Sequence, residues 1–167
     1  MSSSTDSPLA FSLRPAVLRD VSAIVQMVRE LAEFEQLAHL VQVTPEKLRP
    51  HLFGEKPVAE AWMAEVAGEP VAFALFFTNF STFLAQPGLY LEDLYVKPAH
   101  RQLGIGRALL TRLAQLAVER GNARFEWSVL DWNENAIAFY KKLGAVVMPD
   151  WRICRLSGDA LTLLAGR

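Results

Sequence analysis

The chain has 167 residues, 51% of them hydrophobic, and a formal net charge of −1. This length suits one globular domain, whereas the absence of a net positive charge argues against nucleic-acid binding, and the longest apolar run, residues 71–77, is too short to span a bilayer. Cys154 is the only cysteine and the histidines are scattered, so we expect neither a disulfide within the chain nor a metal site.

The N-terminal residues 1–10 are Ser-rich and have neither a basic start nor an apolar stretch. They predict a loose tail rather than a signal peptide. We expect a single domain over residues 11–167, in a cytoplasmic protein.

Helical and strand patterns follow along the rest of the chain. We expect a strand over residues 11–14. A helix capped by Asp20 should follow it, and a second helix should begin at Thr44 and Pro45. Strands at 62–66 and 71–77 form a hairpin, and a loop over 78–88 carries Phe80 and Phe83, which line a pocket, form a subunit contact or pack onto their own core. Further on we expect strands at 89–96 and 125–130, helices at 105–121 and 134–143, a closing strand pair at 146–148 and 151–156, and a last helix capped by Ser157. This order predicts a mixed α/β protein with one central sheet.

The segment from Leu89 to Gly121 carries the clearest chemical signal. An acidic strand is followed by a basic loop and then by a helix that begins at the Gly104-Ile105-Gly106 turn. The first amides of a helix have no internal partner, the helix dipole favours negative charge there, and glycines let a ligand approach the backbone. With Arg101 and Arg107 flanking the turn, this predicts a phosphate or pyrophosphate site. The alternative is a glycine-bearing turn that only begins a helix.

Common nucleotide-binding motifs fit this loop poorly. Arg107-Ala108 follows the second glycine where a phosphate loop requires Lys-Ser/Thr, and Leu109 stands where a dinucleotide fingerprint needs Gly or Ala. The pattern Arg101-x-x-Gly104-x-Gly106 resembles instead the acyl-CoA loop of the GCN5-related N-acetyltransferases (GNAT). Residues 133–145 are similar to the Asn-x-x-Ala-x-x-Phe-Tyr-x-x-x-Gly segment of that family, at a fitting distance along the chain.

The resemblance extends to the diamine acetyltransferase subgroup, including its thialysine-acetylating branch. It rests on residues 29–35, 90–93, 130–133 and Trp151-Arg152. It implies an α/β (α+β) GNAT fold, in which a central mixed, mostly antiparallel sheet is flanked by helices. It also implies acetyl-CoA as co-substrate without a metal, a small-molecule amine substrate and a homodimer.

By this resemblance, the acetyl-CoA contacts fall into three groups. The backbone of one strand would pair with the pantetheine amides as an added strand does, the loop would bind the pyrophosphate, and the later helix would contact CoA. The expected residues are Leu94, Tyr95 and Val96 in the strand, Arg101, Gln102, Leu103, Gly104, Ile105, Gly106 and Arg107 in the loop, and Asn133 and Ala136 in the helix. Asn133 is also explained as a simple helix cap.

The chemistry requires an uncharged amine to attack the acetyl thioester. An alkylamine has a pKa of about 10.4, so only about one molecule in 2,500 is uncharged at pH 7, a shortfall of roughly 4.6 kcal/mol. Glu92, mid-strand beside the loop, is the candidate base, and the alternative is that it only anchors the cation. Asp93 points to the opposite face if the strand is regular, a bulge would alter this, and a structural role for Asp93 is the alternative.

Tyr140 is the candidate proton donor to the leaving CoA thiolate. A phenol is a weaker acid than a thiol, so full transfer is uphill by roughly 2 kcal/mol unless the site lowers the pKa of Tyr140. The alternative is a buried aromatic residue beside Phe139. Because Cys154 lies outside both motifs, we expect direct transfer without a covalent acyl-enzyme.

The acceptor follows from residues that match substrate-contacting positions of the diamine enzymes. These are Phe34, Glu35, Glu92, Glu126, Trp127 and Ser128, and Asp93, beside Glu92, is the second candidate carboxylate for substrate binding. The loop before Trp151 is short and holds one acid, Asp150, so a long polycation would lose part of its binding surface. We therefore expect a small cationic amine: a lysine analogue, an amino acid or a short diamine. A protein or peptide amine acetyltransferase and a non-catalytic acyl-CoA-binding regulator are the alternatives.

Overall fold

The computed structural model describes residues 10–166, and residues 1–9 of the predicted tail lie outside this range. The chain divides after Ser128 into two compact units. Over the described range, no helix combines the length and the apolar character that crossing a membrane requires.

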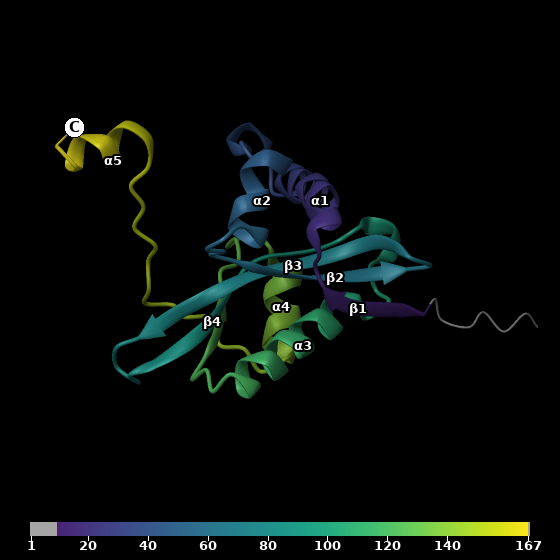
Figure 1. Ribbon diagram of the computed structural model, residues 1–167. Helices are drawn as coiled ribbons and strands as arrows, with labels where there is room; N and C mark the ends of the chain where they lie inside the picture. The colour runs from purple at the N-terminus through teal and green to yellow at the C-terminus, as the bar shows by residue number, and fades with distance from the viewer. Residues whose placement is uncertain (1–9, 167) are drawn as a thin grey trace, which may run out of the picture. The chain divides into compact units, whose positions relative to one another are not determined.

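The first unit is built on a five-stranded sheet with the order β1-β2-β3-β4-β5 (Figure 1). Its strands are β1 (Phe11–Pro15), β2 (Glu60–Val66), β3 (Glu69–Ser81), β4 (Gln86–Val96) and β5 (Phe125–Trp127). Neighbouring strands are antiparallel except β4 and β5, which are parallel. This confirms the predicted mixed, mostly antiparallel sheet.

Helices cover both faces of this sheet. The helices α1 (Val21–Phe34) and α2 (Pro45–Phe53) lie on one face and α3 (Ile105–Glu119) on the other (Figure 1). Ile24 and Met27 of α1 are fully buried against Phe73 of β3, and Leu109 and Leu113 form the buried stripe of α3. The helical spacing of apolar residues predicted a buried face that includes Ile24, Leu109 and Leu113, but it did not include Met27.

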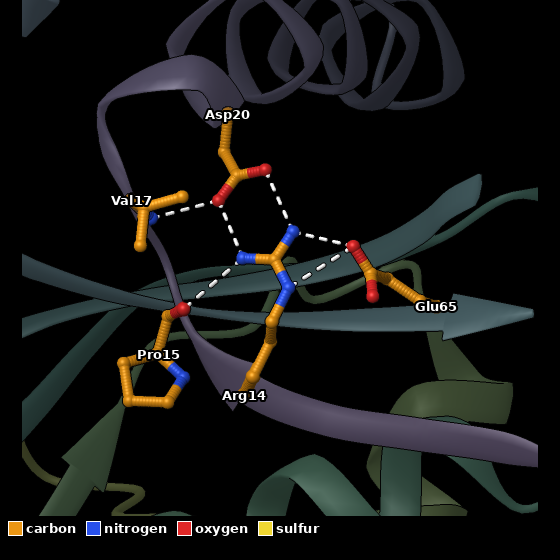
Figure 2. Close-up of polar contacts among 5 residues, drawn as sticks. All are labelled: Arg14, Pro15, Val17, Asp20 and Glu65. Carbon is orange, nitrogen blue, oxygen red and sulfur yellow. Dashed lines mark hydrogen bonds and ion pairs between the residues drawn. The ribbon is translucent and has the colours of Figure 1, made fainter. Parts of the chain in front are cut away.

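An ion-pair network joins the first strand to the start of α1 (Figure 2). The Arg14 guanidinium donates from Nη1 to Asp20 Oδ2 at 2.6 Å and from Nη2 to Asp20 Oδ1 at 2.9 Å. It also donates to the Glu65 carboxylate on β2. Asp20 stands at the N-cap position as predicted, but its side chain accepts from Arg14 and from the Val17 amide instead of capping the helix.

The predicted loop over residues 78–88 is wrong. β3 continues to Ser81, β4 begins at Gln86, and these two residues are paired across the hairpin. The pairing of Asn79 with Gly88 and of Phe80 with Pro87 extends the ladder beyond the predicted strand ends. It continues from the Phe77–Tyr90 pair, whose rings lie 5.1 Å apart across the two strands. Phe83 at the turn is 96% exposed and does not pack onto the core.

The second unit contains α4 (Glu134–Lys142) and α5 (Gly158–Leu164). Asn133 caps α4, because its Oδ1 accepts from the Ala136 amide at 3.2 Å. The predicted strand pair at 146–148 and 151–156 is wrong, since residues 145–157 contain no strand in the structure. A strand pattern alone does not form a strand, because the backbone groups need a pairing partner. β5 likewise ends at Trp127, before the predicted end at residue 130.

Candidate functional site

A β-bulge interrupts β4 at Glu92. Leu75 of β3 lies opposite Asp93 and the next residue, Phe76, lies opposite Leu91, so Glu92 is the extra residue of the bulged strand. The two-residue alternation that places Glu92 and Asp93 on opposite faces therefore breaks at this point. The side chain of Glu92 is exposed and that of Asp93 is half-buried.

The pairing of β4 with β5 stops at the same place. β5 pairs only with Leu89, Tyr90 and Leu91, whereas β4 continues to Val96. Over residues 92–96 the edge of β4 that faces away from β3 has no pairing strand among the described residues. Leu94, Tyr95 and Val96, whose backbone was expected to pair with pantetheine, lie on this edge. Such an edge presents backbone donors and acceptors to an extended ligand.

The charges of three carboxylates, Glu92, Asp93 and Glu35, interact at the bulge. Burial, reinforced by the charges of Glu92 and Glu35, raises the pKa of Asp93 to about 6. Burial also raises the pKa of Glu35, which follows the last residue of α1. Within the described part of the first unit, no ion pair joins these carboxylates to a basic side chain. A bound cation would relieve their mutual repulsion and favour their ionised forms.

Glu126, another predicted substrate contact, has its charge compensated within the fold. Its Oε2 accepts from Asn79 Nδ2 at 3.0 Å and lies 2.8 Å from Arg124 Nε. The other two predicted substrate contacts of this segment also have partners within the fold. The Ser128 hydroxyl is 2.8 Å from the Tyr90 hydroxyl, and the centre of the Trp127 ring is 4.9 Å from that of the Phe125 ring. A substrate cation would have to compete with Arg124 for Glu126, so the three carboxylates at the bulge are the stronger candidates for an anchor.

The glycine-bearing loop has a backbone conformation that suits the binding of an anion. Gln102 and Gly104 have φ angles of 66° and 82°, so this short loop twice enters the left-handed region. Successive residues that alternate in this way direct their amides toward one point. The N-terminus of α3 has no side-chain cap. Within the described residues, the first backbone-to-backbone hydrogen bond donated from this stretch comes from Ala108, to Gly104 at 2.9 Å.

Gly104 and Gly106 meet different structural requirements in the loop. Gly104 has the positive φ angle, which residues with a side chain rarely adopt. A Cβ at Gly106 would meet only Val96 Cγ2, at an ordinary contact distance of 3.8 Å. The fold itself therefore does not require glycine at position 106, and the space above its backbone is open to a ligand.

Arg101 lies against the end of α1. Its Nε donates to the Val96 carbonyl at 2.9 Å, and its guanidinium carbon is 5.2 Å from the centre of the Phe34 ring and 5.6 Å from that of Tyr95. Burial and the Glu30 carboxylate raise the pKa of Tyr95, which keeps the ring a neutral phenol. Sequence reasoning expected Arg101 as an acetyl-CoA contact in the loop and did not predict its contact with the end of α1.

Tyr140 and the two remaining predicted CoA contacts belong to the second unit. Tyr140 lies in α4 with its ring 5.5 Å from that of Phe139. The Ala136 amide donates a hydrogen bond to the Asn133 side chain in the N-terminal cap of the same helix. The roles of these three residues stay predictions.

A family model decides the identity of this fold. The model of the Acetyltransferase (GNAT) family matches residues 25–145, which include β4, the glycine loop and α4. The chain belongs to the GNAT family. It is an acetyl-CoA-dependent N-acetyltransferase, which confirms the sequence resemblance.

Relatives of known activity give the branch of the family. The chain is 38% identical over 166 residues to the thialysine N-epsilon-acetyltransferase of Mus musculus, covering 93% of this chain and 97% of the relative. It is 33% identical over 194 residues to the L-ornithine N5-acetyltransferase of Arabidopsis thaliana, covering 89% and 85% of the two chains. Among solved structures, an integron cassette protein of V. cholerae has a TM-score of 0.79 at 23% identity, covering 94% of this chain and 98% of that one, which is a likeness of fold.

The bulge at Glu92 leaves no clear trace in the pattern of apolar residues. The buried residues Leu89, Leu91 and Tyr95 keep an even spacing across it, so strand alternation alone did not reveal the inserted residue. The contacts of Arg101 with Phe34 and of Glu126 with Asn79 have no local signal, because these partners are distant in the sequence.

Proposed function

We propose that this enzyme transfers the acetyl group of acetyl-CoA to the primary amine of a small cationic acceptor: a lysine analogue, an amino acid or a short diamine. The observation that carries the proposal is the group of carboxylates at the β4 bulge, Glu92, Asp93 and Glu35, beside the open edge of the strand. The named substrates of the mouse and Arabidopsis relatives, thialysine and ornithine, are acceptors of this class.

The carboxylates serve two needs of the reaction. They attract the ammonium form that predominates at pH 7, and Glu92, which is exposed, can accept the proton that the amine must lose. Asp93 titrates near pH 6, so it is mostly ionised at neutral pH and binds the cation as an anion. Glu92 acts either as base or as cation anchor, and these roles differ in what its removal does to turnover.

The transfer is direct. The amine nitrogen forms the new bond to the acetyl carbon while the bond from that carbon to the CoA sulfur breaks, and Tyr140 donates a proton or a hydrogen bond to the departing thiolate. Backbone groups of Leu94, Tyr95 and Val96 and the amides of residues 102–107 hold the co-substrate in this scheme. The acetyl group passes to the amine without a covalent enzyme intermediate.

An acceptor screen tests the proposal. Purified protein is mixed with acetyl-CoA and with lysine analogues, amino acids, short diamines, polyamines or peptides, and release of the CoA thiol is followed. We expect the largest kcat/KM for acceptors that carry one terminal amine and a second charged group within a few bonds. Turnover of peptides alone would favour the protein acetyltransferase, and acetyl-CoA binding without any turnover would favour the regulator.

A pair of variants separates the two roles of Glu92. Glu92→Gln keeps the size of the side chain but removes its charge. If Glu92 is the base, kcat falls at least tenfold and the loss persists at saturating acceptor. If Glu92 only anchors the cation, the acceptor KM rises while kcat is retained. Glu55→Gln, at an exposed carboxylate outside the site, is the matched control and leaves both parameters unchanged.

A further inference from the structure

We propose that Phe34, the last residue of α1, is a positioning residue for acetyl-CoA binding that acts by holding the Arg101 side chain beside the glycine loop. This inference rests on the proposed site, in which Arg101 contributes to acetyl-CoA binding. Sequence resemblance suggests Phe34 only as a substrate contact. The geometry gives it a second partner, the Arg101 guanidinium.

Three groups fix the Arg101 side chain. Its Nε donates to the Val96 carbonyl at the end of β4, and its guanidinium lies within cation–π distance of two rings, at 5.2 Å from Phe34 and 5.6 Å from Tyr95. Val96 and Tyr95 are backbone neighbours on the open strand edge, whereas Phe34 comes from a helix on one face of the sheet. Arg101 therefore connects the end of α1, the end of β4 and the loop that begins α3.

This arrangement favours ligand binding by pre-organisation. A free arginine has many rotamers, and a ligand that uses its guanidinium must restrict them. A guanidinium that is already held on two aromatic faces loses less freedom, and its remaining N–H donors stay available to an anion. Phe34 is 46% exposed, so its contribution to the folded core is small compared with that of the buried residues of α1.

The test is a double-mutant cycle on acetyl-CoA binding, measured by calorimetry without any amine. Phe34→Leu keeps an apolar side chain but removes the ring, and Arg101→Met keeps the unbranched stem but removes the cation. We expect Phe34→Leu to raise the Kd for acetyl-CoA about two- to fivefold, the effect of one exposed cation–π contact. In the Arg101→Met background, the same substitution should change the Kd by less than about 1.5-fold, because the pair is already broken.

A matched substitution controls for the loss of an exposed ring. Phe80→Leu changes a ring that is 60% exposed near the β3–β4 turn, and we expect the Kd to stay as in the unmodified protein. In kinetic assays at saturating acceptor, Phe34→Leu should raise the acetyl-CoA KM and leave kcat unchanged, which a general loss of structure would not do.

The contrary outcomes are distinct. If Arg101→Met weakens acetyl-CoA binding but Phe34→Leu does not, the proposed cofactor site stands and the positioning role is wrong. If the two substitutions weaken binding independently, Phe34 does not act through Arg101 and the inference is overturned. If Arg101→Met leaves the Kd unchanged, both the role of Arg101 in the site and the inference built on it fail.

Discussion

Replacing Asp93 with asparagine is expected to stabilise the folded protein at pH 8 while it weakens acceptor binding. The carboxyl is half-buried beside the β4 bulge, where burial and two further acids raise its pKa from the ordinary 3.8 to about 6. That difference corresponds to about 3 kcal/mol between the two protonation states. Part of it is shared with the neighbouring acids and screened by solvent, so about 1–3 kcal/mol is the range expected in an unfolding experiment.

The sign of the pH dependence follows from proton binding. Because the folded state holds the Asp93 proton more tightly than the unfolded state, this group lowers stability as the pH rises from about 4 to about 6, and its effect is constant above that range. Asparagine has no proton to lose. The free energy of unfolding of Asp93→Asn, relative to that of the unmodified protein, should therefore increase by about 1–3 kcal/mol between pH 4 and pH 8.

Urea denaturation at the two pH values measures this change, and comparison within each pH cancels the titration of groups that do not interact with Asp93. Glu55→Gln, an exposed carboxylate of the same unit, should show no such change. In the same preparations, Asp93→Asn should raise the acceptor KM, because an anionic neighbour of the cation has been removed. A difference between variant and unmodified protein that is the same at pH 4 and pH 8 would refute the claim that the Asp93 carboxyl is desolvated.

Three further predictions test other parts of the site and the fold. Tyr140→Phe should lower kcat at least tenfold while the Kd for acetyl-CoA, measured by calorimetry, is retained; unchanged turnover would remove Tyr140 as proton donor. Gly106→Ala should leave the melting temperature and the Kd nearly unchanged, whereas Gly106→Val should weaken binding through bulk, and Gly104→Val should do so through its positive φ as well; an unaltered Kd in both Val variants would refute the loop assignment. Hydrogen bonds from Arg14 hold the pKa of Asp20 below its ordinary value, so this pair stabilises the fold at neutral pH and less as the pH falls through the lowered pKa. Asp20→Asn should cost about 2–3 kcal/mol in urea unfolding at pH 7 and less in acid, and a loss independent of pH would contradict the ion pair.

The secondary-structure elements predicted best are the helices whose signals lie within a short stretch of the sequence. The Thr44-Pro45 signal marks the start of α2, where Thr44 Oγ1 accepts from the Lys47 amide at 3.3 Å. The spacing of apolar residues likewise identified α1 and α3, because a helix buries one face wherever its partner lies. The ends of the β3–β4 hairpin and the absence of strands after Gly144 were missed, because they depend on pairing between distant segments.

The candidate site divides in the same way. The glycine loop could be predicted as a candidate anion site, since that chemistry lies in consecutive backbone amides and in the residue types that leave them accessible. The hydrogen bond between Asn79 and Glu126 and the placement of Arg101 against Phe34 could not be predicted, because side chains far apart in the sequence meet only after the sheet has formed. The ion pair between Arg124 and Glu126, which are only two residues apart, was overlooked. An ion pair such as the one between Arg124 and Glu126 decides which carboxylates remain available to attract a cation. The number of residues that match substrate-contacting positions of the diamine enzymes is therefore larger than the number of carboxylates available to bind the acceptor.

The bulge and the open strand edge meet at residues 91 and 92. Leu91 is the last residue of β4 that pairs with β5, and Glu92 is the residue that has no partner in the register with β3. A bulge bends its strand and increases the local twist, and the pairing of β4 with β5 stops at the residue before the insertion. The inserted residue is an exposed carboxylate, and residues 94–96 beyond it have no pairing strand on one side among the described residues. In the proposed site, the carboxylate at the bulge binds the amine and the strand edge beyond it binds the pantetheine of the acetyl donor.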